Sequence, residues 1–205
     1  MNLKEALDII EETLDQVEGI PSSDIPDIDL YMDQVTTFME NKFRDSTRNP
    51  EEDKIMTKTM INNYAKNDLL PAPVKKKYSK DHMMLLILIY YYKGLLSISD
   101  IATLIRPLKE HFGQDDGTLE LEQIYTELIS GECKQADLVR RDIKDLMKDA
   151  EGSFTEAPAE AKDSLQLLSL ISSLGFDIYL KKLVIGRLLD ELEEKNTKNQ
   201  KPSKK

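Results

Sequence analysis

The sequence predicts an all-α protein, and three observations support that fold class. Apolar residues recur at helical spacing along most of the 205-residue chain. Charged residues make up 32% of it, which suits long helices that expose one face. Ser79 and Ser97 each precede an apolar stretch, as the N-cap residues of helices do. A small β element is expected only at a lysine-rich turn near Lys76.

The chain opens with a predicted amphipathic helix over residues 2 to 18, whose polar face is nearly all acidic. Its apolar positions fall on one face: Leu3, Ala6, Leu7, Ile10, Leu14 and Val17. Gly19 ends this helix, and the turn residues from Pro21 to Asp27 predict a loop. Residues 1–28 are therefore expected to form an N-terminal helix and loop.

Two helices and a polar connection are predicted next. The first runs from about Asp29 to Phe43, and a connection over residues 44–55 leads to a short helix that starts at Thr57 or Thr59. The two helices are expected to pack together through these four residues: Val35, Phe38, Ile61 and Tyr64. The segment from Leu69 to Pro73 is expected to stop the second helix, because proline lacks an amide donor and restricts its predecessor.

The stretch from Met83 to Lys93 is apolar on every side, which predicts a buried helix. Its apolar run is too short to span a bilayer, which needs about 20 residues, so no membrane association is expected. Consecutive tyrosines at positions 90–92 point in different directions on a helix. Core packing is therefore expected of them rather than a platform for stacking bases. A further helix is predicted after Ser97, through Ile101, Leu104 and Ile105.

A short helix ending in a tyrosine, a Leu-Leu-Pro stop, a basic strip closed by Tyr-Ser and a long apolar helix together resemble the winged helix-turn-helix of the MerR-type regulators. The resemblance implies that the short helix is a recognition helix and that the basic strip is a wing lying on the phosphate backbone. Tyr64 matches the tyrosine of that group, and Lys76 and Tyr78 match the arginine and tyrosine of its wing. Asn62 stands where the group usually has arginine, and the wing has no glycine. Residues 29–110 are accordingly expected to form a MerR-like winged helix-turn-helix domain with a small β wing.

Three phrases are also similar to signatures of a family of Gram-positive bacterial proteins catalogued as a domain of unknown function. They are Leu30 to Val35, Thr57 to Tyr64, and Lys76 to Ser79. This similarity covers roughly the first half of the chain. It implies little about function, because that family is uncharacterised.

The winged-helix resemblance implies a set of residues that contact double-stranded DNA. Base edges are expected to meet Thr59, Asn62 and Asn63, because asparagine pairs well with adenine. Phosphates are expected to meet Lys75, Lys76, Lys77 and Lys80, which would position the protein on the duplex. The same surface is expected to include Tyr64, Lys66 and Tyr78.

The distribution of charge along the chain is compatible with a localised contact. The chain carries a net charge of −10, but residues 54–82 hold seven lysines and two aspartates, for a local charge of +5. We call residues 54–82 the basic stretch. A basic stretch between acidic flanks suits a phosphate contact, and it equally suits a patch that binds another protein. A helical adaptor that binds protein without binding DNA is therefore the alternative interpretation.

No sequence pattern indicates an enzyme, a cofactor or a metal site. Glycine-rich phosphate loops, serine nucleophile elbows and Cys-x-x-Cys spacings do not occur, and Cys133 is the single cysteine. The acidic pair Asp115 and Asp116, with Glu120 and Glu122 nearby, lacks the pattern of a cation-binding loop. The residues at the start of the chain do not resemble a secretory leader, so a cytoplasmic location is expected.

The second half of the chain is expected to be helical as well. Residues 111–152 are predicted to form an acidic region with helices at about 119 to 131 and 133 to 150, followed by a flexible joint over 151 to 161. Residues 153–195 are predicted to form a helical segment broken at Gly175 that serves as the interface of a homodimer, because so much apolar surface needs a partner. Residues 196–205 are expected to be a disordered, lysine-rich tail.

Overall fold

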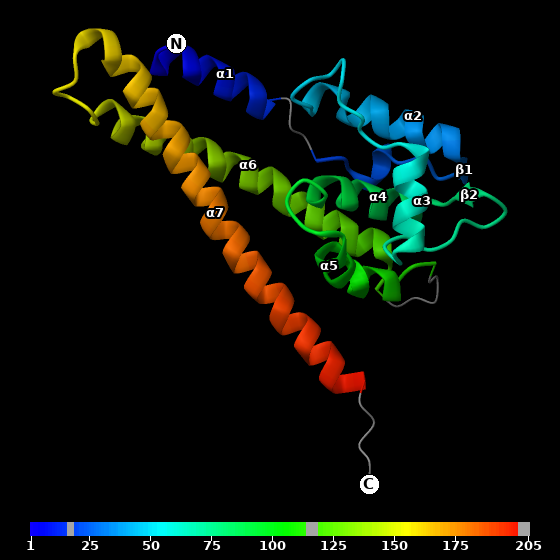
Figure 1. The fold of residues 1–205 in the computed structure, drawn as a ribbon. Helices are drawn as coiled ribbons and strands as arrows, with labels where there is room; N and C mark the ends of the chain where they lie inside the picture. Colours follow the sequence, from blue (N-terminus) through cyan, green and yellow to red (C-terminus); the bar gives the residue numbers. More distant parts are fainter. Residues whose placement is uncertain (16–18, 114–118, 201–205) are drawn as a thin grey trace. The chain divides into compact units, whose positions relative to one another are not determined.

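The structure is a computed structural model that describes residues 1–15, 19–113 and 119–200. The described residues are mostly helical, which confirms the predicted all-α class. The helices are α1 (Leu3–Asp15), α2 (Met32–Phe43), α3 (Lys58–Lys66), α4 (Lys80–Tyr92), α5 (Ile98–Glu110), α6 (Leu121–Glu151) and α7 (Ala159–Gln200). Two short strands, β1 (Leu30–Tyr31) and β2 (Lys77–Tyr78), and two 3-10 turns, Ser22–Asp24 and Arg44–Ser46, complete the elements (Figure 1).

The chain divides into two compact units, each built from segments far apart in the sequence. The first unit contains residues 1–19 and 130–185, and the second contains residues 20–129 and 186–205. The α1 helix, most of α6 and most of α7 therefore belong to the first unit. All elements from β1 to α5 belong to the second.

The core of the second unit surrounds α4. Every residue from Met83 to Ile89 has a relative exposure of 0%, so this helix is buried on all sides as its apolar sequence predicts. Side chains of α2, α3, α5 and the start of α6 complete the core, and β2 also contacts α4. Tyr90, Tyr91 and Tyr92 pack against its edge, consistent with the expected core role.

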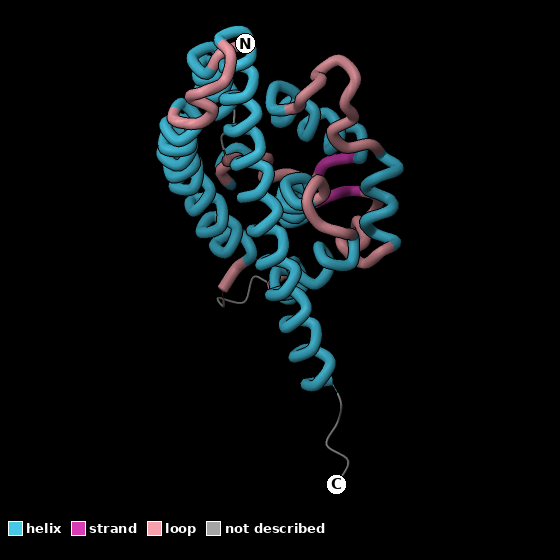
Figure 2. The backbone as a smooth tube through the Cα atoms, turned by 60° about the vertical axis from the view of Figure 1, so that its left-hand side comes forward, coloured by secondary structure: helices cyan, strands magenta, loops and turns pink. Residues whose placement is uncertain are grey.

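The predicted contact between α2 and α3 is present. Val35, Ile61 and Tyr64 are buried in one core, Phe38 packs against it, and the two helices touch. The start of α2 differs from the prediction, because the helix begins at Met32 rather than Asp29. Leu30 and Tyr31 form β1 instead, since they pair antiparallel with β2 (Figure 2).

The first unit is held together by apolar side chains from three helices, α1, α6 and α7, that pack against one another. Its buried core consists of Leu3, Ile143, Met147, Ala150 and Leu170. Ion pairs flank this core: Arg140 contacts Glu11 at 3.5 Å and Asp15 at 2.5 Å, and Lys144 contacts Glu11 at 2.9 Å. The α1 helix is thus tied to α6 by apolar and charged contacts together.

Several predicted helix boundaries in this half are wrong. Residues 121–151 form the single helix α6, which passes through Gly131, and α7 continues through Gly175 (Figure 1). Among the described residues, no atom outside the helix's own backbone lies within 4 Å of where a side chain would start at either glycine, so neither marks a tight approach. The helix also continues through residues 196–200, where a disordered tail was expected.

Three sequence predictions fall partly or wholly outside the described residues: the end of the first helix at 16–18, the acidic pair at 115–116, and the tail at 201–205. The joint predicted over 151–161 is shorter, because α6 ends at Glu151 and α7 begins at Ala159. Gln166 bridges the connection, since its side-chain amide donates to the carbonyl oxygens of Glu151 at 2.7 Å and Ser153 at 3.2 Å.

A candidate nucleic-acid interface on α3 and the lysine turn

The α3 helix is short and sharply bounded at both ends. At its start the Thr57 hydroxyl accepts a hydrogen bond from the backbone N–H of Met60 at 3.2 Å, as an N-cap does. At its end Asp68 adopts a left-handed conformation with φ 57°, and the N–H of Leu69 donates to the carbonyl of Tyr64 at 2.9 Å. This is a Schellman arrangement with aspartate in the usual glycine position. The helix therefore ends at Lys66, before the prolines that were predicted to stop it.

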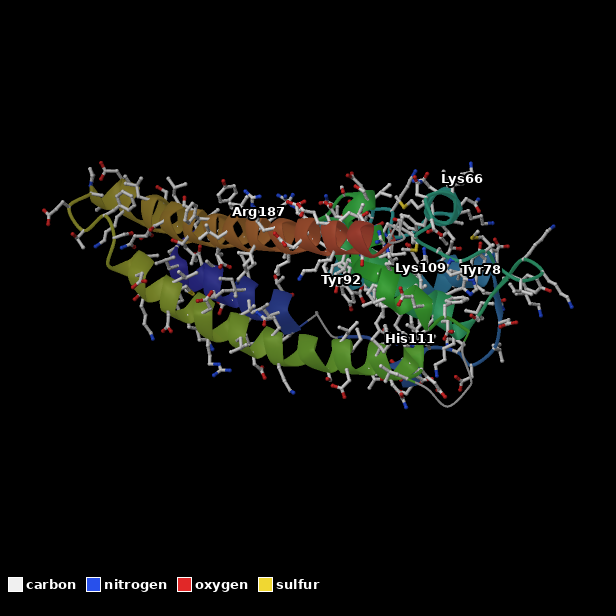
Figure 3. The ribbon with its side chains drawn as sticks, turned by 90° about the horizontal axis from the view of Figure 1, so that it is seen from below. Lys66, Tyr78, Tyr92, Lys109, His111 and Arg187 are labelled. Carbon is white, nitrogen blue, oxygen red and sulfur yellow. The ribbon has the colours of Figure 1, made fainter. Side chains whose placement is uncertain are left out.

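One face of α3 points into the core and the other is open to solvent. Ile61 and Tyr64 are buried, whereas the predicted base-reading residues Thr59, Asn62 and Asn63 are all exposed. A surface depression of about 630 Å³ runs over this open face, which we call the α3 depression. It is lined by Lys54, Thr57, Thr59, Met60, Asn62, Asn63 and Lys66. Lys66 is exposed at the end of the helix (Figure 3).

The lysine turn, residues 74–77, is a tight hairpin turn leading into β2. The backbone N–H of Lys77 donates to the carbonyl of Val74 at 2.9 Å. The two central residues, Lys75 and Lys76, have φ values of 51° and 65°. Positive φ at both positions is typical of a type I′ turn, which favours asparagine and glycine there. Lysine therefore occupies both positions at a conformational cost of roughly 1–2 kcal/mol each.

The strand pairing fixes where this turn projects. Leu30 pairs with Tyr78 and Tyr31 pairs with Lys77, so β2 is held against the residues that lead into α2. The ammonium group of Lys77 lies 5.3 Å from the centre of the Tyr31 ring, a cation–π contact that restrains its side chain. Lys75 and Lys76 remain exposed at the tip.

Three of the predicted contact residues face elsewhere. Tyr64 and Tyr78 are buried, and burial raises the pKa of both phenols above the usual range. The ring of Tyr78 packs edge-on against His82 with 5.4 Å between centroids, so it is part of the core. Lys80 forms ion pairs with Asp27 at 2.7 Å and Glu122 at 3.0 Å, and its side chain is only 19% exposed.

The two carboxylates hold Lys80 strongly in its charged form. The hydrogen bond to Asp27 is the largest influence that raises its pKa, and the contacts with Glu122 add to it. This lysine therefore joins the loop before β1 to the start of α6. Sequence reasoning grouped it with its neighbours because the charge is adjacent in the chain, whereas its partners are distant.

His82 begins the buried helix and has a structural environment. Its Nδ1 accepts a hydrogen bond from the backbone N–H of Ser79 at 3.0 Å, which forms the capping box of α4. Its Nε2 is buried with no hydrogen-bond partner among the described residues. Burial lowers the pKa of the imidazole, while the nearby carbonyls of Ala72 and Pro71 act in the opposite direction.

Three residues of the α3 depression, Lys54, Thr57 and Met60, were not among the predicted contacts. Lys54 and Thr57 precede the helix, yet they line the same hollow as Asn62 and Lys66. The signal for Lys54 was its membership of the basic stretch. Thr57 could have been included because the sequence predicts it as a start of this helix. An N-cap residue lies next to the first turn, so it borders the exposed face of the helix.

The part of the chain that the structure describes contains no cluster of three or more histidine, cysteine, aspartate or glutamate side chains placed to hold a metal ion. Within the same described ranges, no helix combines the length and the apolar character needed to cross a membrane.

Comparison with known proteins places the candidate interface inside a recognised domain. A family model described as Domain of unknown function (DUF1836) matches residues 20–128, which is more than half of the chain. This range closely follows the first segment of the second unit, residues 20–129, so it includes both α3 and the lysine turn. No curated protein and no solved structure matches the chain.

Proposed function

The chain belongs to the family of the domain of unknown function DUF1836, and we propose that it is a DNA-binding transcriptional regulator that uses a MerR-like winged helix. In this proposal α3 enters the major groove and the lysine turn lies on the phosphate backbone. The observation that carries the proposal is the exposed polar face of α3, a helix that packs through its other face against α2. Near it in the sequence, Lys75 and Lys76 are exposed at a turn with a strained backbone.

The exposed residues of α3 have the chemistry of a base-reading surface. Asn62 and Asn63 offer amides that can form paired hydrogen bonds with adenine, and Thr59 offers a hydroxyl. Asn63 also accepts a hydrogen bond from the Asn67 side chain at 3.1 Å, which orients its amide. Lys54 and Lys66 stand at the border of the α3 depression, where phosphates flank a groove.

The lysine turn supports the proposal through its unfavourable conformation. A turn that needs positive φ at two positions is most stable with asparagine and glycine, and here it carries Lys75 and Lys76. Strained backbone is found preferentially at functional sites, where the strained residue is needed for another reason. A pair of projecting ammonium groups that contacts phosphate supplies such a reason.

The proposal also includes the cytoplasmic location and the homodimer predicted from the sequence. Helix-turn-helix proteins commonly bind as dimers to two half-sites about one helical turn apart. A single copy offers one short recognition helix, and two copies would double the number of base contacts. The net charge of −10 is compatible with this arrangement, because the basic stretch is local.

The test is binding of the full chain to a duplex DNA pool, measured by fluorescence anisotropy over a series of salt concentrations. Each lost phosphate contact lowers the slope of log affinity against log salt by about 0.9. We expect the double substitution Lys75→Ala and Lys76→Ala to weaken binding to all sequences and to flatten the slope by about 1.8. The matched control, Lys4→Ala with Lys182→Ala, removes two exposed lysines of the other unit and should leave the slope unchanged.

A second arm of the same experiment examines base reading. On a sequence selected from the pool, Asn62→Ala should keep the salt slope and reduce discrimination between sites by about 1–3 kcal/mol. Absence of any binding at low salt would reject the DNA proposal. The helical adaptor would then be the better candidate, because α7 exposes many apolar side chains that suit a protein partner.

A further inference from the structure

The end of α3 is anchored to α5 by one lysine. The ammonium group of Lys109 donates a hydrogen bond to the backbone carbonyl of Asp68 at 2.5 Å and forms an ion pair with its carboxylate at 2.7 Å. The Lys109 side chain is largely covered, so water competes little for these contacts. Because Asp68 is held in this way, the exposed residue just before it, Asn67, has a defined position at the end of α3.

Asn67 bonds to Asn63, four residues earlier, through both its backbone and its side chain. Its backbone N–H and its side-chain amide donate to the backbone carbonyl of Asn63, at 3.0 Å and 2.8 Å. The same side-chain nitrogen also donates to the side-chain oxygen of Asn63, at 3.1 Å. These bonds share the two residues and the last turn of the helix, so they hold the Asn63 amide in one orientation.

The chemistry of these bonds determines which way round the two amides lie. A backbone carbonyl only accepts, so the Asn67 atom that faces it must be the amide nitrogen. That nitrogen only donates, so the Asn63 atom that faces it must be the side-chain oxygen. Exchanging oxygen and nitrogen in either amide would bring two donors or two acceptors together. Asn63 therefore turns its oxygen toward Asn67 and keeps its two N–H groups for another partner.

An amide that offers only donors suits a different base from one that offers both a donor and an acceptor. In the major groove guanine presents two neighbouring acceptors, N7 and O6, and one nitrogen can donate to both, as that of lysine does. Adenine presents one acceptor and one donor, thymine a single acceptor, and cytosine a donor. Asn62 takes part in none of the bonds between Asn63 and Asn67, so its amide keeps the pattern that suits adenine.

We propose that Asn63 reads guanine and that Asn67 is the positioning residue that sets this preference. Asn67 engages the oxygen of Asn63 and leaves the amide nitrogen to meet the base edge. Lys109 supports the pair because it fixes the end of the helix. This inference rests on the proposed function, since it needs α3 in the major groove, and it specifies the base that one residue of α3 contacts.

The experiment measures the base preference of the full chain by fluorescence anisotropy, on a duplex selected from the DNA pool and on its single-base variants. The position that Asn63 reads is the one whose preference disappears in the variant Asn63→Ala. At that position we expect the native protein to favour guanine over adenine by about 5- to 150-fold, the range for one good paired contact.

The decisive variant is Asn67→Ala, which releases the oxygen of Asn63 and keeps every proposed base contact in place. It should lower the guanine-over-adenine ratio by about fivefold or more. The salt slope should stay the same, because the substitution removes no charge. A purely structural role of Asn67 would change the affinity for both bases alike, so the ratio separates the two roles. The matched control is Asn41→Ala on α2, which makes the same change at another exposed position and should leave the ratio unaltered.

Two results would overturn this inference alone. One is a guanine-over-adenine ratio that is equal in the native protein and in Asn67→Ala, and the other is a preference for adenine at the position that Asn63 reads. Both require a chain that binds DNA, so they differ from a failure of the proposed function, in which no duplex is bound even at low salt and this inference falls as well. Circular dichroism of each variant verifies that folding is unchanged.

Discussion

Two helical segments of this protein are rich in apolar residues and have opposite surroundings. Residues 83–89 of α4 are buried without exception, whereas residues 176–185 of α7 are exposed almost throughout. Around α4, the helices α2, α3 and α5, the start of α6 and the strand β2 supply apolar side chains to the same core. The contrast shows that an apolar sequence favours burial of a helix. Whether the helix is buried within one chain depends on how many other elements pack around it.

The largest effect that would test this contrast comes from shortening one leucine in each segment. Leu86 is 0% exposed and surrounded by core residues, so Leu86→Ala should lower the free energy of unfolding by about 3–5 kcal/mol. Leu180 is 46% exposed, so Leu180→Ala should cost less than about 1 kcal/mol within one chain. Urea unfolding at low protein concentration measures both values. Equal losses would show that the two segments are buried alike.

A change of pH should act on α4 and leave the exposed segment of α7 unaffected. The only two histidines are His82 and His111, and neither lies in α7. The pKa of His82 is lowered by burial, so the unfolded chain binds a proton more readily than the folded one. Stability is therefore unchanged above the unfolded pKa of about 6.5 and declines as pH falls below it, until the folded pKa is reached.

Hydrogen exchange on α4 between pH 7 and pH 5, corrected for the intrinsic rate, would measure that decline. His82→Gln keeps an acceptor for the Ser79 N–H and cannot titrate in this range, so its unfolding free energy should vary less with pH. If the protection of α4 in the native protein does not depend on pH, the predicted link between His82 protonation and stability is wrong.

The smallest expected effect concerns the helix interior. The α7 helix contains Gly175, and in the part of the chain that the structure describes no atom beyond the helix's own backbone lies within 4 Å of where its side chain would start. The substitution Gly175→Ala adds a methyl group without a clash and reduces the freedom of the unfolded chain. It should stabilise the first unit by about 0.5–1 kcal/mol. The readout is the urea midpoint at low protein concentration. A loss of stability would mean that another group packs against Gly175 and clashes with the added methyl group.

The parts of the fold that depend on neighbouring residues could be read from the sequence. Ser79 and Ser97 were identified as helix starts because a capping side chain bonds to an amide within the same turn. The buried character of α4 followed from its own composition. The end of α3 was misplaced, because its Schellman arrangement uses Asp68 where glycine is the usual signal.

The features that escaped prediction depend on residues far apart in the chain. Leu30 and Tyr31 belong to a strand only because Tyr78 and Lys77 pair with them. Lys80 was assigned to the phosphate contacts although Asp27 and Glu122 bind it. Within the candidate interface, Thr59, Asn62, Asn63 and Lys66 do share one exposed surface, because helical spacing alone brings them together.

The ion pairs of Lys80 have a consequence for covalent chemistry at lysine. Acylating reagents react with the neutral amine, so a lysine must lose its proton and be reachable before it is modified. Hydrogen bonds to two carboxylates raise the pKa of Lys80, and its side chain is only 19% exposed, whereas Lys75 and Lys76 are exposed to water. Within a few residues of each other, the chain thus presents amines of different accessibility. Enzymatic or chemical acetylation would neutralise the exposed lysine turn while leaving the adjacent structural ion pairs in place.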